Sequence, residues 1–157
     1  MQYRVRKAHV QDVGPIYELL KSLAKGGLLL PRSFANIYES LQTFFVAEDG
    51  LGTGTIMGIG ALQVAWEDLG EVRSLAVRDE YRGQGIGQAL TLAVEKEAWE
   101  LGIRRTFALT YVPEFFVKLG YRIVGLDALP QKIWAVCFNC VHYPDCKEIA
   151  VVKDFAR

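Results

Sequence analysis

The sequence predicts a mixed α/β protein of the α+β type, with a central sheet of mostly antiparallel strands. Stretches with strand-like apolar patterns are interspersed along the chain with stretches of helical spacing. Two of the strand-like stretches flank residues 49–52, Asp-Gly-Leu-Gly, a composition typical of a hairpin connection. With 157 residues, 51% of them hydrophobic, we expect one domain over residues 1–157 with a substantial core.

The first half of the chain predicts one strand, two helices and two further strands. Asp12 is a suitable N-cap for the first helix, which Gly26 and Gly27 would end. Ser33, placed after Pro31, can cap a second helix in the same way. The strands are expected at residues 3–6, 43–48 and 54–66.

The second half begins with residues 71–77, the third strand of a meander, which leads through a glycine loop into a helix ending near Gly102. After a buried strand at residues 106–110, Pro113 can open a short helix that Gly120 ends. Strands at residues 121–124 and 147–152 complete the order β-α-α-β-β-β-α-β-α-β-β.

The charge balance argues against several classes of partner. Lys and Arg total 18, as do Asp and Glu, so the net charge of zero disfavours nucleic acid or an anionic membrane as a bulk partner. The N-terminus lacks the apolar core of a secretion signal, and no apolar run is long enough to span a bilayer. We therefore expect a cytoplasmic protein with reduced thiols that acts on a small molecule, with a homodimer as one assembly left open.

The glycine-rich stretch at residues 82–87, Arg-Gly-Gln-Gly-Ile-Gly, predicts an anion site. It lies between a strand and a helix N-terminus, where glycines allow close backbone approach and the first-turn N–H groups lack intrahelical partners. Together with the helix dipole, these donors favour a phosphate group. A P-loop would need Lys-Ser/Thr where Gln88 and Ala89 stand, and the Rossmann spacing Gly-x-Gly-x-x-Gly is absent.

The pattern Arg82-x-x-Gly85-x-Gly87, directly after a Leu-Ala-Val strand, resembles the GNAT superfamily of acetyl-CoA-dependent N-acetyltransferases. The resemblance covers nearly the whole chain and implies that two neighbouring strands, residues 71–77 and 106–110, splay apart. Acetyl-CoA would lie in the opening, with its pantetheine amides paired to the first strand and its pyrophosphate held by the loop. The residues expected to bind it are Leu75, Ala76, Val77, Arg82, Gly83, Gln84, Gly85, Ile86, Gly87, Gln88 and Phe116.

Segments outside the loop resemble the short, stand-alone N-acetylglutamate synthases of bacterial arginine biosynthesis. This resemblance implies transfer of an acetyl group from acetyl-CoA to the α-amine of L-glutamate. We expect no amino-acid-kinase domain of the kind that the longer enzymes carry. The segments are residues 30–33 (Leu-Pro-Arg-Ser), 44–48 (Phe-Phe-Val-Ala-Glu), 71–77 (Glu-Val-Arg-Ser-Leu-Ala-Val) and 130–134 (Pro-Gln-Lys-Ile-Trp).

Acetyl transfer requires a neutral amine, so a base or a water chain must take the amine proton. Glu71, at the start of the first splayed strand, matches a glutamate with that role in the resembled family, although a strand-end carboxylate can also be a plain surface charge. Many members protonate the leaving thiolate from a Tyr, but Phe116 stands at that position here. The resemblance then implies a hydroxyl at the end of the second splayed strand, which is Thr110 with Tyr111 adjacent; the alternative is an ordinary strand-end Thr.

Glutamate carries two carboxylates, and arginine binds carboxylates in bidentate geometry. The resemblance indicates Arg32, between the first two helices, and Lys132 as substrate-binding residues. Arg73, on one face of the first splayed strand, could serve as well. Each could instead be a solvated surface charge, but together the three favour an anionic amino acid over a polyamine or a basic peptide.

All three cysteines fall in one segment with one of the two histidines, as Cys137-x-x-Cys140-x-His142-x-x-x-Cys146. The set could form a tetrahedral structural zinc site that pins the C-terminal loop. The tight spacing and the single Cys-x-x-Cys pair favour unligated thiols, so we expect no metal, and a disulfide is disfavoured in the cytoplasm.

Two other functions stay open from the sequence. The acceptor could be a different amine, such as another amino acid, an antibiotic or a protein N-terminus; Arg32 and Lys132 would then lie far from the thioester. The protein could also be a non-catalytic acyl-CoA sensor, with Glu71 out of reach of the acetyl group.

Overall fold

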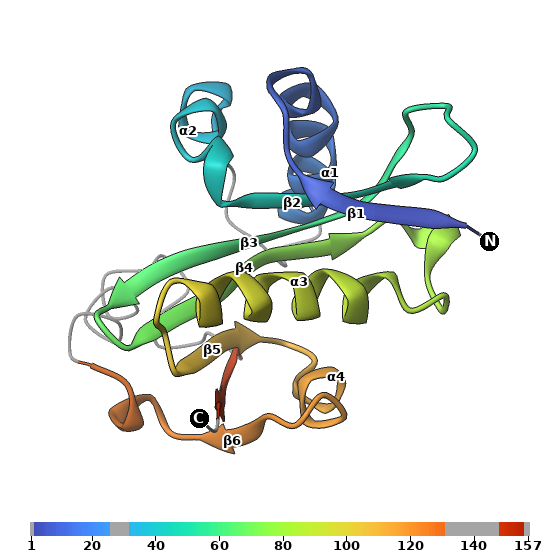
Figure 1. The fold of residues 1–157 in the computed structure, drawn as a ribbon. Helices are drawn as coiled ribbons and strands as arrows, with labels where there is room; N and C mark the ends of the chain where they lie inside the picture. Colours follow the sequence, from blue (N-terminus) through green and yellow to red (C-terminus); the bar gives the residue numbers. More distant parts are fainter. Residues whose placement is uncertain (1, 26–31, 131–147, 156–157) are drawn as a thin grey trace.

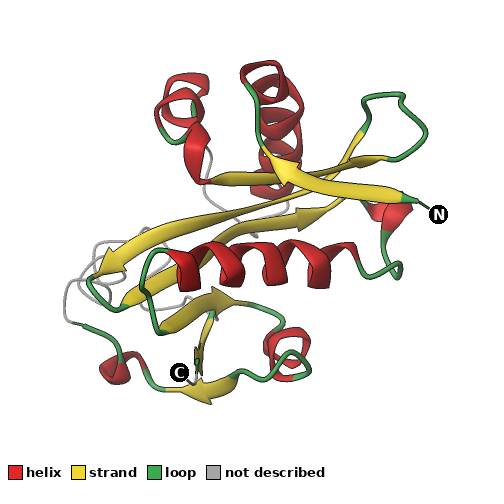
Figure 2. Ribbon diagram, in the orientation of Figure 1, coloured by secondary structure: helices red, strands yellow, loops and turns green. Residues whose placement is uncertain are grey.

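The fold is built on a seven-stranded sheet with the strand order β1-β2-β3-β4-β5-β7-β6 (Figures 1 and 2). It comes from a computed structural model in which residues 2–25, 32–130 and 148–155 are described; the expected helix end at Gly26 and Gly27 lies outside them. The helices are α1 (Val13–Lys25), α2 (Phe34–Glu39), α3 (Ile86–Glu100) and α4 (Pro113–Val117). The strands are β1 (Tyr3–Lys7), β2 (Phe44–Asp49), β3 (Ile56–Trp66), β4 (Leu69–Val77), β5 (Arg105–Thr110), β6 (Arg122–Val124) and β7 (Ile149–Asp154).

The strands are antiparallel except where β4 meets β5, which confirms the mixed, mostly antiparallel layout. β4 and β5 pair in parallel only between residues 69–71 and 105–107. Beyond Glu71, residues 72–77 of β4 have no strand partner on the β5 side within the described part of the chain. The two strands therefore diverge in the middle of the sheet, as the resemblance implied.

Local side-chain contacts account for the starts of the first two helices. Ser33 caps α2 as predicted, because its Oγ accepts a hydrogen bond from the N–H of Asn36 at 3.0 Å. Asp12 directly precedes α1, but its carboxylate points backwards. It accepts hydrogen bonds from the backbone N–H of His9 at 2.6 Å and from Arg6 at 2.7 Å. Asp12 therefore closes the preceding 3-10 turn and pairs with β1, and it does not cap α1 as expected.

Several strand bounds differ from the expectation by one or two residues. β4 begins at Leu69, because Leu69 and Gly70 already pair with Arg105 and Thr106 of β5. β3 begins at Ile56 because Gly52 and Gly54, with φ of 81° and 75°, belong to a loop longer than a tight hairpin turn. β7 continues to Asp154, which still pairs with Arg105 of β5. The order of helices and strands along the chain is the predicted one.

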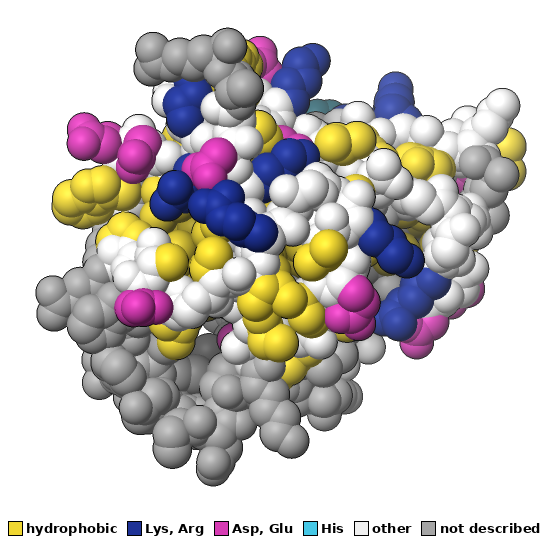
Figure 3. Space-filling view, turned by 90° about the horizontal axis from the view of Figure 1, so that it is seen from below, with side chains coloured by type: hydrophobic (Ala, Val, Ile, Leu, Met, Phe, Trp, Pro, Cys, Tyr) yellow, Lys and Arg dark blue, Asp and Glu magenta, His cyan; other side chains and the backbone are white. Residues whose placement is uncertain are grey.

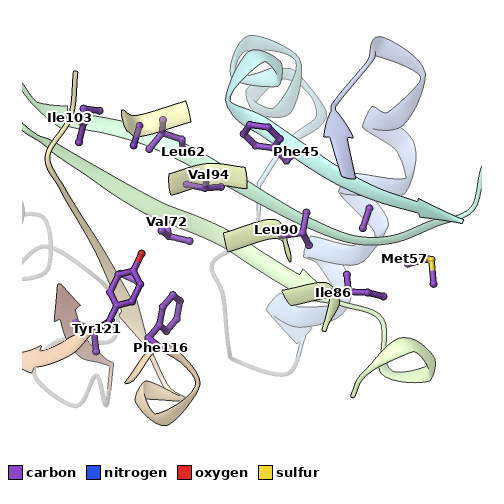
Figure 4. Packing of buried hydrophobic residues seen from close by; sticks show 14 residues of the cluster. Phe45, Met57, Leu62, Val72, Ile86, Leu90, Val94, Ile103, Phe116 and Tyr121 are labelled. Atoms are coloured by element: carbon purple, nitrogen blue, oxygen red, sulfur yellow. The ribbon is translucent and has the colours of Figure 1, made fainter. Parts of the chain in front are cut away.

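Helices cover both faces of the sheet, and side chains that alternate along the strands pack beneath them (Figure 1). α3 lies on one face, where Leu90 belongs to a buried cluster with Phe45 and Val72 (Figure 4). α1 and α2 lie on the other face, where Ile16 belongs to a second cluster with Phe44. We call these the α3 face and the α1–α2 face. A further buried cluster, which includes Leu69, Phe107 and Val152, joins β4, β5 and β7.

The face of the molecule drawn in Figure 3 shows no dominance of one charge. In Figure 3, which views the molecule from below the orientation of Figure 1, basic and acidic side chains lie near one another with hydrophobic side chains between them. This mixture agrees with the net charge of zero. Among the helices of the described residues, none is long and apolar enough to cross a membrane.

Candidate active site

The loop before α3 has the geometry of an anion site. Gly83 and Gly85 have φ of 80° and 79°, in the left-handed region that other residues avoid. Gly85 is the N-cap of α3, and its carbonyl accepts the first hydrogen bond of the helix, from the N–H of Ala89 at 3.0 Å. The N–H groups of residues 86–88 therefore have no acceptor within the helix and are available to a phosphate.

Neighbouring side chains shape this loop. The Tyr3 hydroxyl of β1 donates a hydrogen bond to the carbonyl of Gly85 at 3.3 Å. A Cβ at Gly87 would lie 3.2 Å from the ring of Phe115, so a side chain would be crowded there. Gln84 Oε1 is buried without a hydrogen-bond partner among the described residues.

The open edge of β4 continues from the strand divergence towards the loop. Leu75 and Val77 pack on the α3 face and Ala76 packs on the α1–α2 face, so β4 presents its backbone N–H and C=O groups to the opening. Such an edge suits a ligand that carries amide groups. Arg82 lies at the exposed end of the loop in an ion pair with Asp79 at 3.1 Å.

The two adjacent aromatic rings of α4 have different surroundings. Phe116 is 4% exposed and packs edge-on against Tyr121 in the α3-face core, with ring centroids 5.2 Å apart (Figure 4). Phe115 is the ring that borders the loop, at Gly87. The family pattern indicates Phe116 by its position and gives no sign of Phe115. A contact of Phe116 with the coenzyme stays a prediction.

Glu71 lies at the last residue pair that joins β4 to β5. Its side chain is 16% exposed, and its Oε1 lies 3.5 Å from Nε of Arg73, two residues along the same strand face. Burial raises the pKa of Glu71, the charge of Arg73 lowers it and the charge of Glu148 raises it, with a net increase. A raised pKa makes the ionised carboxylate a stronger base.

Arg32 reaches β4 from the start of α2. It donates three hydrogen bonds, from Nη1 to Ser74 Oγ at 3.0 Å, from Nη2 to Ser40 Oγ at 2.8 Å and from Nε to Asn36 Oδ1 at 2.7 Å. Its guanidinium also lies over the ring of Phe44, 5.1 Å from the centroid. All of these partners are neutral. The sequence predicts Arg32 as a site residue, but none of the residues that hold it.

Arg32 and Arg73 share one region of the α1–α2 face. Burial and, second, the positive charge of Arg73 lower the pKa of Arg32, which places the two guanidinium groups within electrostatic range. Among the salt bridges of the described residues none involves Arg32, and Arg73 pairs only with Glu71. We call Arg32, Arg73 and Glu71 the divergence cluster. Its incompletely paired arginines suit a ligand that carries a carboxylate.

Thr110 ends β5 and is 8% exposed. Its Oγ1 accepts a hydrogen bond from the N–H of Val112 at 3.0 Å, which leaves the hydroxyl proton for donation. Strand alternation places Thr110 on the α3 face with Ala108, whereas Glu71 lies on the α1–α2 face, opposite to its neighbour Val72. The two candidate groups thus stand on opposite sides of the divergence, one beside the arginines and one on the side of α4.

The remaining predicted site residues are not part of the described structure. Lys132, the second basic residue expected in the substrate pocket, lies outside the described residues. So do all four zinc candidates, Cys137, Cys140, His142 and Cys146. Within the described ranges, His, Cys, Asp and Glu side chains form no group of three or more that could hold a metal ion.

A comparison with protein-family models identifies the family to which this fold and this loop belong. The family model of the acetyltransferase (GNAT) domain matches residues 40–123, which include β4, the glycine loop and β5. The chain belongs to the GNAT acetyltransferase family. It is therefore an N-acetyltransferase with acetyl-CoA as co-substrate, and the predicted family and fold are confirmed.

Several curated relatives cover most of the chain. It is 38% identical over 149 residues to an uncharacterized N-acetyltransferase of Chlorobaculum tepidum, which covers 95% of this chain and 94% of that protein. It is 40% identical over 117 residues to an amino-acid acetyltransferase of Mycobacterium tuberculosis, covering 74% and 67%. An amino-acid acetyltransferase of Pseudomonas putida is 34% identical over 128 residues, but the chain spans only 29% of its length.

Solved structures show the same arrangement. N-acetylglutamate synthase from Neisseria gonorrhoeae, complexed with coenzyme A and N-acetyl-glutamate, superimposes with a TM-score of 0.90 and 27% identity, over 100% of this chain and 36% of that chain. A Mycobacterium tuberculosis protein in complex with CoA gives a TM-score of 0.83 and 29% identity, over 98% and 99%. Both relatives were solved with CoA, which agrees with the fit of the loop and the β4 edge to that ligand.

Proposed function

We propose that the protein acetylates the α-amine of L-glutamate, the first step of arginine biosynthesis, and that residues 1–157 form one cytoplasmic acetyltransferase domain. The relatives named amino-acid acetyltransferase support an amino acid as the acceptor. The N-acetyl-glutamate in the Neisseria complex supports glutamate. Because the chain spans only 29% and 36% of two of these longer proteins, their complete activities are carried over here as a proposal.

The observation that carries the proposal is a pair of arginines at β4: Arg73 lies 3.5 Å from Glu71, and Arg32 is hydrogen-bonded to Ser74. A guanidinium has five N–H donors, and the three hydrogen bonds of Arg32 leave one N–H on each terminal nitrogen. Two such donors suffice for one carboxylate. An amino acid held by Arg32 and Arg73 through its carboxylates would bring its amine to the region of Glu71.

Glu71 would then take the amine proton, directly or through a water molecule. As the amine nitrogen bonds to the acetyl carbon, the carbon–sulfur bond breaks and the proton leaves the nitrogen for the carboxylate. Arg73, 3.5 Å away, favours the ionised form of Glu71 while burial makes that form more basic. This balance suits a base that must accept a proton at neutral pH.

The groups on the other side of the divergence would hold the donor. Acetyl-CoA supplies the activated acetyl group, and the loop at residues 82–88 and the open edge of β4 would bind it. Thr110 would donate a hydrogen bond to the sulfur as charge develops there, since its oxygen already accepts from Val112. Lys132 would complete the substrate pocket.

A screen of acceptors tests this proposal. The purified protein is incubated with acetyl-CoA and each of the amino acids, a polyamine and a basic peptide, and thiol release is measured. We expect the highest kcat/KM for L-glutamate, with aspartate and glutamine well below it. A different amine with the highest kcat/KM would replace glutamate, and acetyl-CoA binding without turnover on any amine would indicate an acyl-CoA-binding protein.

A further inference from the structure

Ser74, next to Arg73 on β4, has an unusual backbone conformation. Its φ is 55°, and it is the one non-glycine residue with positive φ in the described part of the chain. The register between β3 and β4 shifts here, so that Ser74 and Leu75 together oppose Gly60. A Cβ at Gly60 would lie 3.3 Å from Cδ1 of Leu75, so the missing side chain gives Leu75 room.

This bulge changes which face of the sheet each residue of β4 meets. Val72 and Leu75 both pack in the α3-face core, although residues three apart in a regular strand point to opposite faces. The bulge absorbs the difference and leaves Ser74 on the α1–α2 face beside Arg73. There the Ser74 hydroxyl accepts the hydrogen bond from Arg32 at 3.0 Å.

Ser74 also differs in location from the other two partners of Arg32. Asn36 lies within α2 and Ser40 directly follows it, so both hold Arg32 to the helix that begins two residues after it. Ser74 ties the guanidinium to the sheet, on the strand whose open edge faces the coenzyme site. A disfavoured backbone conformation that persists at such a place is consistent with a functional constraint.

We propose that Ser74 is a positioning residue for the acceptor: its hydroxyl fixes Arg32 relative to β4, so that one strand sets the place of both the acceptor carboxylate and the acetyl donor. The inference rests on the proposed function, because it takes Arg32 to bind the acceptor. The bulge reverses the alternation of side chains along β4, and it thereby makes the hydrogen bond between Arg32 and Ser74 possible.

Two substitutions separate the hydroxyl from the backbone. Ser74→Gly removes the hydroxyl and accepts positive φ without cost, so the bulge is retained. Ser74→Ala removes the hydroxyl but keeps a Cβ in the disfavoured conformation. We expect both variants to raise the KM for the acceptor about tenfold, as for loss of a hydrogen bond from a charged group, and to leave the KM for acetyl-CoA within about twofold.

The decisive measurement is a double-mutant cycle with Arg32→Ala, run on the folded Ser74→Gly protein. We expect Ser74→Gly to change the acceptor KM about tenfold in the wild-type background and hardly at all when Arg32 is absent. An unchanged acceptor KM in Ser74→Gly, or an equal loss in both backgrounds, would overturn the inference. A normal Ser74→Gly with a defective Ser74→Ala would overturn it too, because the backbone of the bulge, and not the hydroxyl, would then account for the geometry of the site.

The cycle is run with the amino acid that gives the highest kcat/KM in the acceptor screen. If the wild-type protein does not turn over L-glutamate but the cycle on its true acceptor shows the coupling, the proposed function fails and the positioning role stands. If L-glutamate is turned over and the cycle shows no coupling, the proposed function stands and the positioning role fails.

Discussion

Two of the clusters in which arginines meet carboxylates are paired in opposite ways. In the first, which we call the β1 network, Arg6 donates hydrogen bonds to Asp12 at 2.7 Å and to Glu48 at 3.1 Å, and Arg4 also pairs with Glu48. Hydrogen bonds from Arg6 and then Arg4 lower the pKa of Glu48 to about 2. Burial alone would raise the pKa of Asp12, but hydrogen bonds from Arg6 and the His9 N–H outweigh it, and the pKa is lowered.

In the divergence cluster the charges lie near one another without such pairing. Glu71 has Arg73 at 3.5 Å, beyond ordinary hydrogen-bond distance, and its pKa is raised, chiefly by burial. Arg32 is held by neutral groups, and its pKa is lowered by burial and by Arg73. In the β1 network each charged side chain is hydrogen-bonded to an opposite charge, so no ligand is needed to balance it. Where buried charges lack that pairing, the atoms of a substrate can supply it.

The largest effect that this comparison predicts is on stability, in the β1 network. Asp12→Asn keeps the shape of the side chain but leaves Arg6, whose side chain is 17% exposed, without its closest countercharge. Arg6 keeps Glu48 as a countercharge at 3.1 Å, so the cost is below that of a fully unpaired buried charge. The free energy of unfolding should fall by about 2–3 kcal/mol while kcat of the folded protein is unchanged. Urea denaturation and steady-state kinetics measure the two quantities.

The pH dependence of that loss is a second readout of the same variant. Because the pKa of Asp12 is lowered in the folded protein, its stabilisation is present above the ordinary carboxyl pKa and is lost as the pH falls through the lowered value. The difference in unfolding free energy between wild type and Asp12→Asn should therefore disappear in acid. A fall in kcat without a loss of stability would mean that the β1 network is part of the catalytic machinery.

The next effect is on substrate binding, in the divergence cluster. Arg32→Ala should raise the KM for L-glutamate about ten- to a hundredfold, because a charge-assisted pair contributes about 1.5–3 kcal/mol. The KM for acetyl-CoA should stay within about twofold. Arg4→Ala is the matched control, since Arg4 is an exposed member of the β1 network and should leave both constants unchanged. Equal KM values for glutamate in Arg32→Ala and Arg4→Ala would remove Arg32 from the acceptor site.

The smallest predicted effect is on the free energy of unfolding, when the buried carboxylate of Glu71 is replaced. Because the pKa of Glu71 is raised, its contribution to stability is full below the ordinary carboxyl pKa and is lost as the pH rises through the raised value. Glu71→Gln should therefore raise the free energy of unfolding at neutral pH by about 0.5–2 kcal/mol and change it little in acid, the opposite of Asp12→Asn. Thermal unfolding at the two pH values measures this. A lower free energy of unfolding for Glu71→Gln would instead show that an arginine stabilises the Glu71 carboxylate, as in the β1 network.

Much of the fold could be read from local sequence signals. The loop needs glycine at Gly83 and Gly85 because both have positive φ, and glycine is the residue that reveals this in a sequence. The Ser33 cap is equally local, since its partner is three residues away. The strand divergence followed from the family resemblance, because no local pattern marks the residue at which two paired strands separate.

The details that the sequence did not reveal depend on tertiary contacts. Ser74 gives no sign of positive φ, because serine rarely adopts it, and its contact with Arg32 joins residues 42 positions apart. Asp12 has the composition of a helix cap, but the approach of Arg6 turns its carboxylate away. Phe115 and Phe116 are adjacent aromatic residues, and the orientation of α4 decides that the ring of Phe115 borders the loop.

The central claim, that Glu71 is the base, is tested by the ratio of the kcat values of wild type and Glu71→Gln across pH. Gln keeps the size of the side chain but cannot accept the amine proton. We expect a ratio of about a hundred or more at neutral pH, the usual scale for a positioned base. The ratio should shrink in alkali, where more of the free amine is already deprotonated. Acetyl-CoA affinity should hardly change. A Glu71→Gln protein with full turnover at neutral pH would contradict the account, because another group or bulk water would then remove the proton.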